Sequence, residues 1–159
     1  MDLLAAAQAL EASALGEWMR GSPVAYPAAN LVHILGLVML VGGIGIVDLR
    51  LAGLGPRIPL APLAHVLTPI AITGVILLLV SGFLLFAADA GPLMKSAVFL
   101  RKMVLIAIAL VNALAFQALS RGRIDAWDEG PPIAARVMAL LSLLLWLTIA
   151  TFGRLIAYT

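Results

Sequence analysis

The residues able to do chemistry in this chain of 159 residues are few, and most of them stand in apolar stretches. Cysteine is absent, which excludes disulfides, thiolate metal sites and cysteine nucleophiles. A metal would have to be held by histidine, methionine, carboxylate or backbone groups. His33 lies inside a run as apolar as lipid, and the only other histidine is His65. An ionisable side chain in such a run is costly and commonly functional, so His33 is the first candidate ligand.

The neighbours of His33 on its own helix allow two interpretations. Gly36 and Gly43 share its face, because offsets of three and ten residues return to the same side of a helix. Small residues let membrane helices approach closely, and His33 would then hydrogen-bond across a helix contact. Alternatively, the glycines leave room for a flat macrocycle, with the imidazole as axial ligand of haem b. Both interpretations stay open at this point.

Three residues outside the first helix are expected near the depth of His33. Lys102 and Arg154 would suit an anion such as a haem propionate, a quinone headgroup or a lipid phosphate, or they would extend to the headgroups. Met103 is a candidate second ligand, beside five-coordination or a ligand from a partner subunit. His65 lies roughly 15 to 20 Å away in depth and cannot share the iron within one chain. The predicted cofactor-binding residues are His33, Gly36, Gly43, Lys102, Met103 and Arg154, with His33 as the metal ligand.

Composition identifies a membrane protein with the lipid bilayer as its environment. Hydrophobic residues make up 64% of the chain and charged residues 11%, far from the composition of a soluble domain. The net charge of +2 is too small, and the basic residues too scattered, for a nucleic-acid partner.

Four apolar stretches are long enough to cross a hydrocarbon core of about 30 Å. They predict an all-α, integral membrane four-helix bundle that forms a single transmembrane domain over residues 1–159. The connections are short and rich in Gly, Pro and charge, so consecutive helices should be antiparallel neighbours. The expected spans are approximately 28–47, 63–88, 101–119 and 133–157.

The N-terminal segment predicts one amphipathic helix over residues 3–19 that lies at the membrane interface. Leu3, Ala7, Leu10, Ala14 and Trp18 recur at helical spacing along it. The chain begins without a basic residue, so no signal cleavage is expected. The stretch "GSPVAYP" is expected to end this helix before the first span.

The distribution of basic residues predicts the orientation. Setting aside Arg101, Lys102 and Arg154, which lie within helices, leaves two basic residues on the side of the termini and five on the other. The positive-inside rule then places both termini in the periplasm and the first and third loops in the cytoplasm of a bacterial inner membrane. The group on the side of the termini is Arg20 and Lys95. The group on the other side is Arg50, Arg57, Arg121, Arg123 and Arg136.

Hydrolytic and transfer chemistry has no support in the sequence. It contains no phosphate loop, nucleophile elbow, metalloprotease signature or pair of intramembrane carboxylates, so a stand-alone enzyme is not expected. Asp48 can pair with His65, or with Arg50 or Arg57 at the surface. The methionines could bind Cu(I) if they were clustered, but they are spread over separate helices and indicate packing.

Most of the chain resembles a known family. The segments "AANLVHILGLVMLVGGIGIVDLRL", "SAVFLRKMVLIAIALVNALAFQ" and "PPIAARVMALLSLLLWLTIATFGRLIAYT" resemble small bacterial four-helix membrane proteins of unknown function related to the copper-resistance D-type membrane domain. The resemblance implies an inner-membrane helical bundle with redox or copper-related associations. The matching positions are His33, Asp48, Arg50, Phe99, Lys102, Asn112, Trp146, Gly153 and Arg154.

These observations favour a redox-associated membrane protein that binds haem b beside His33, for electron transfer or as the membrane anchor of a redox partner. One alternative is a cofactor-free accessory or assembly subunit of a membrane complex, in which His33 secures helix packing. A third is a copper-handling membrane protein. A homo-oligomer or a larger membrane complex would fit each of them.

Overall fold

The structure is a computed structural model that describes residues 2–128 and 130–158, and every regular element in those residues is a helix. Four long helices carry the fold, and five short ones lie at their ends. In chain order the elements are α1 (Leu3–Glu11), α2 (Ala14–Gly21), α3 (Ala25–Ala52), α4 (Leu60–Ala88), α5 (Ala90–Lys95), α6 (Ala97–Ser120), η1 (Ile124–Trp127), α7 (Ile133–Leu155) and η2 (Ile156–Tyr158).

The predicted membrane bundle is confirmed. α3, α4, α6 and α7 are each long and apolar enough to cross a bilayer, which makes the chain a multi-pass membrane protein. α3, α4 and α6 begin three or four residues earlier than the apolar runs suggest, whereas α7 begins at Ile133 as predicted. α3 starts at Ala25 and takes Pro27 into its first turn, where a missing N–H breaks no intrahelical bond.

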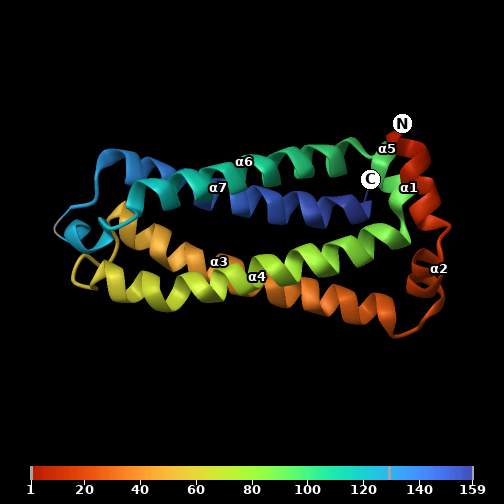
Figure 1. Cartoon of the computed structure of the whole chain (residues 1–159), viewed down its shortest axis with the longest axis horizontal. Coiled ribbons are helices and arrows are strands. Elements are labelled where there is room, and N and C mark those ends of the chain that lie inside the picture. The colour runs from red at the N-terminus through yellow and green to blue at the C-terminus, as the bar shows by residue number, and fades with distance from the viewer. Residues whose placement is uncertain (1, 129, 159) are drawn as a thin grey trace.

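The bundle has two distinct ends (Figure 1). One end carries α1, α2, α5 and both described chain ends, and we call it the terminal end. The opposite end carries the α3–α4 loop and the α6–α7 loop with η1, and we call it the loop end. α3 packs most extensively on α4, α6 packs mainly on α7, and α3 also packs on α7. Two apolar clusters of buried side chains, one near the loop end and one in the middle, join all four spans.

Glycine lets α3 and α4 approach closely. A Cβ atom at Gly74 would lie 2.6 Å from the Leu40 nitrogen and 2.7 Å from the Gly36 oxygen. One at Gly43 would lie 2.9 Å from the Leu67 oxygen. Backbones therefore touch along this crossing, as small residues permit between membrane helices.

The single N-terminal interfacial helix predicted over residues 3–19 is wrong. Two helices occupy this segment, because Ser13 caps α2 through the Gly16 amide and donates its hydroxyl to the Leu10 carbonyl at 2.6 Å. The predicted apolar stripe is consequently split, and Trp18 is exposed while Met19 is buried. Both helices lie across the terminal end (Figure 1).

Candidate functional site

His33 is half-buried and lies against α4. Its Nδ1 atom is 2.9 Å from the Ser81 hydroxyl, and that hydroxyl donates its own proton to the Leu77 carbonyl. With the serine proton on the Leu77 carbonyl, the Ser81 oxygen can accept from His33, an arrangement that favours the neutral imidazole tautomer with its proton on Nδ1. The lone pair of Nε2 is then the one that could bind a metal or accept a proton.

Lys102 reaches the region of His33, as the sequence predicts. It is half-buried on α6, and its charge lies near enough to interact with His33. The ammonium lies over α7 at Gly153, where a Cβ atom would be 3.3 Å from Lys102 Nζ. Of the predicted set, His33 and Lys102 are the two half-buried ionisable residues, and their charges interact.

The prediction that Gly36 and Gly43 line a cofactor is not supported by their positions. The backbone of α4 occupies the space beside both glycines, since a Cβ at Gly36 would lie 2.9 Å from the Gly74 oxygen. There is no room for a macrocycle on this face while α3 and α4 stay together. The glycines serve the helix contact that the first interpretation expects.

Met103 and Arg154 are both exposed. Successive helical residues point about 100° apart, so Met103 faces outward where Lys102 faces inward. Its exposed fraction is 39%. Arg154 follows the inward Gly153, and its exposed guanidinium donates to the Tyr158 hydroxyl at 2.6 Å. The structure therefore does not gather these two residues with His33.

His65 lies far from His33, as expected. It is exposed near the loop end, where it lines a shallow pocket with Thr68, Pro69 and Ile124. His33 contacts Ser81, sixteen residues further along α4 than His65, or about 24 Å at the helical rise. Within the described residues, no three His, Cys, Asp or Glu side chains are grouped so as to hold a metal ion.

Asp48 is a buried carboxyl group, whereas the sequence analysis expects it in a pair near the membrane surface and leaves it out of the predicted site. It is 4% exposed, and the Ser142 hydroxyl of α7 hydrogen-bonds to it. Across residues 2–128 and 130–158, its Oδ2 atom is the one buried side-chain nitrogen or oxygen without a partner. On the same helix α7, the Met138 carbonyl accepts from the Asn112 amide of α6 at 3.0 Å. The predicted pairings of Asp48 with His65, Arg50 or Arg57 do not occur, because Arg50 binds elsewhere and the other two are exposed.

Arg50 ties the two loops of the loop end together. Its side chain is 4% exposed and donates to the carbonyls of Ile58 (2.6 Å), Pro56 (3.0 Å) and Asp128 (3.2 Å). The Asp128 carboxylate in turn accepts from the Leu60 amide at 2.6 Å and so caps α4. In the sequence, the apolar run before Arg50 was the one sign that this arginine is buried.

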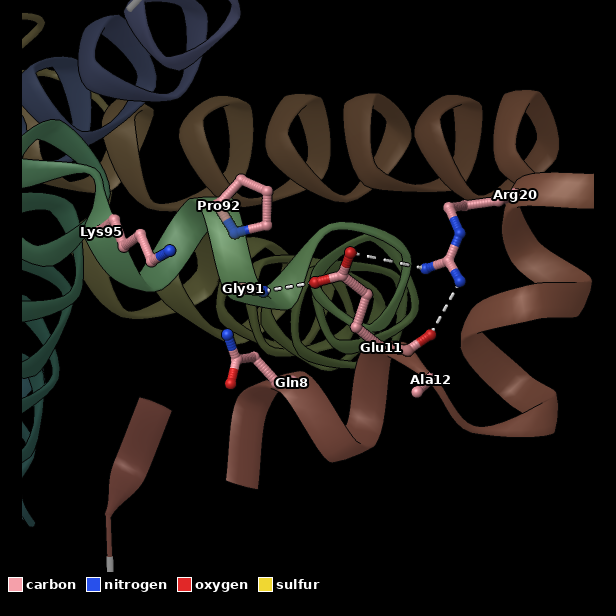
Figure 2. Close-up of a pocket in the computed structure, with 7 residues that line it drawn as sticks. All are labelled: Gln8, Glu11, Ala12, Arg20, Gly91, Pro92 and Lys95. Atoms are coloured by element: carbon pink, nitrogen blue, oxygen red, sulfur yellow. Dashed lines mark hydrogen bonds and ion pairs between the residues drawn. The ribbon is translucent and has the colours of Figure 1, made fainter. Parts of the chain in front are cut away.

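A pocket of about 550 Å³ with charged side chains in its lining lies between α1, α2 and α5 at the terminal end (Figure 2). Its centre is the Glu11 carboxylate, which accepts from the Gly91 amide at 2.6 Å and lies 3.9 Å from an Arg20 nitrogen. Arg20 also donates to the carbonyls of Ala88 and Glu11. These bonds hold α1 and α2 against the end of α4, and Lys95 lines the other side of the pocket.

The fold defines the class of protein: a multi-pass helical membrane protein with isolated ionisable side chains inside the bundle. A comparison with protein families places it further. Residues 10–159 match the profile of a family of unknown function, DUF6644, and the chain belongs to that family. No curated protein and no solved structure matches the chain. The resemblance to the copper-resistance D-type membrane domain therefore stays a prediction.

Proposed function

We propose that this protein is a redox-associated membrane protein in which His33 binds haem b through Nε2. The observation that carries the proposal is the hydrogen-bond chain from His33 Nδ1 to Ser81 and on to the Leu77 carbonyl. Histidines that ligate metals are commonly oriented by such a bond at the other ring nitrogen. Haem b would supply one-electron redox chemistry when bound.

Some of the predicted ligand residues fit haem b and others do not. His33 would offer a nitrogen ligand to the iron, and Lys102 would offer a cation for a propionate. The glycine face does not fit, because α4 occupies it. The ligand set that supports the proposal is accordingly His33 with Lys102, without Gly36, Gly43, Met103 or Arg154.

An optical spectrum of the purified protein, oxidised and reduced, tests the proposal. Protein from cells supplied with haem is expected to show a Soret band that His33→Ala abolishes. His65→Ala is the matched control, since it removes the exposed histidine and should leave the band intact. Ser81→Ala is expected to keep the band and shift the reduction potential, because Nδ1 loses its acceptor. A folded, colourless wild-type protein would refute the proposal.

A cofactor-free accessory or assembly subunit is the second candidate, favoured by the close α3–α4 crossing. In that function the bond from His33 to Ser81 only joins the two helices. His33→Gln, whose amide can still donate to Ser81, would then preserve both stability and assembly. If His33 binds haem, His33→Gln should instead lose the cofactor, because the glutamine amide does not replace the imidazole as a ligand.

A copper-handling role remains the third candidate from the sequence, and metal analysis of the same preparation tests it. The location that goes with all three proposals is a bacterial inner membrane, with both termini in the periplasm. The asymmetry of basic residues between the two ends supports that orientation. A homo-oligomer or a larger complex is part of the proposal too, since the outward methionine Met103 leaves the second ligand to another chain or to none.

A further inference from the structure

Asp48 is a buried carboxyl group near the loop end, far from the proposed haem ligand His33. It lies four residues before the end of α3, about 6 Å from that end at the helical rise. Its surroundings are apolar, with Val47 and Leu51 both buried in the cluster at the loop end. A carboxylate there that keeps its charge needs a partner, because burying an unpaired charge is very costly.

No cation supplies that partner among the described residues. The guanidinium of Arg50, two residues further on, is bound to three backbone carbonyls. The ion pair that the described chain does contain, Glu11 with Arg20, lies at the opposite end. The remaining charged or titratable groups at this end of the bundle are exposed: Arg57, His65, Arg121, Arg123, Asp125, Asp128 and Arg136.

A metal ion is a poor occupant for the same position. Hard cations take about six oxygen ligands, and Ser142 is the one side-chain group that bonds to the carboxyl. Within the described residues, no three acidic, histidine or cysteine side chains group together. A proton needs one oxygen atom, and Oδ2 is the atom left without a partner.

We propose that Asp48 is a proton-binding site inside the bundle, where a single proton taken up from the loop end resides on Oδ2. Bound there, the proton makes the carboxyl group neutral while Ser142 remains bonded to it. Because Asp48 lies about one helical turn from the end of α3, a proton that reaches it from the loop end does not cross the rest of the bundle. This proposal does not depend on haem or on His33.

Infrared spectroscopy of the full-length protein in lipid tests the proposal at neutral pH. The wild type should show the C=O stretch of one protonated carboxyl group, which shifts when aspartate is labelled with ¹³C and when the buffer is changed to D₂O. Asp48→Asn should remove this band. Asp125→Asn, which changes an exposed aspartate at the same end, should retain it.

Two further measurements keep the proposal falsifiable if Asp48→Asn does not fold. In Ser142→Ala the band should remain and change frequency, because the carboxyl group loses its hydrogen bond. Spectra in sodium and in choline buffers should be identical. Absence of a protonated aspartate band in the wild type, its persistence in Asp48→Asn, or its loss when sodium is added would each overturn the proposal.

Discussion

Asp48 and Arg50 stand two residues apart on α3 and meet different surroundings. Two helical steps turn the side chains about 200° from each other, so one faces α7 and the other faces the loops. Arg50 finds three carbonyl acceptors, whereas Asp48 has one hydroxyl partner. The Arg50 guanidinium is therefore well satisfied by hydrogen bonds, whereas the Asp48 carboxyl group keeps an oxygen without a partner.

Arg50→Gln should destabilise the protein by about 3 kcal/mol or more, since buried carbonyls lose donors from a charged group. The two loops that meet at the Asp128 carbonyl should also become mobile. Thermal unfolding in detergent measures the first effect, and amide exchange in residues 53–59 measures the second.

Arg57→Gln is the control for this substitution. Arg57 is exposed in the same loop, so its replacement should change stability by less than about 0.5 kcal/mol. Equal losses in the two variants would contradict the role given to Arg50.

The sequence places His33 and Lys102 within membrane spans, because each lies in a long apolar run, and both are half-buried in the structure. It could not identify the acceptors of Arg50. One of them, Asp128, is 78 residues away and comes near only when the α6–α7 loop folds back. It also could not show that Met103 and Arg154 face outward, since that depends on the rotation of each helix in the bundle.

The contact between α3 and α4 depends on three glycines, and Gly74 is the tightest of them. Gly74→Ala places a methyl group 2.6 Å from the Leu40 nitrogen, so the helices must separate. A loss of about 1–3 kcal/mol is expected, the usual cost of overpacking. Thermal unfolding in detergent measures it, and increased exposure of His33 to modification should accompany it.

Gly42→Ala is the matched control on α3. No atom lies within 4 Å of a Cβ at Gly42, so alanine fits there and improves helix propensity. The two substitutions are chemically identical, and a similar loss in both would show that the crossing is not held by close backbone contact.

The four spans were predictable, because a run of about twenty apolar residues has few stable structures other than a membrane-spanning helix. The short helices were not predictable in this way. α5 has six residues and lies in a segment read as a loop. The break between α1 and α2 depends on one serine that bonds locally, in a stretch whose apolar spacing fits a continuous helix. At this break, local hydrogen bonds outweighed the periodicity.

The arrangement of the ends makes the orientation measurable. Because the chain contains no cysteine, single cysteines can be introduced without background. Lys95→Cys at the terminal end should react with a membrane-impermeant maleimide in cells whose outer membrane is opened. Arg57→Cys at the loop end should react only after the inner membrane is also permeabilised.

The reverse pattern would place the termini in the cytoplasm and contradict the positive-inside assignment. Labelling of both positions from one side would contradict the four-span topology itself. Both positions are exposed in the structure, so a failure to react reports on the membrane and not on burial.

The glycine crossing also bears on how the chain is made. α3 and α4 are synthesised before α6 and α7, and their contact uses residues of these two helices alone. The first hairpin can therefore associate in the bilayer while the ribosome is still translating the second, as independently stable helices do. A defect at Gly74 would then act on a nascent intermediate, which quality-control proteases could degrade before α6 and α7 are synthesised.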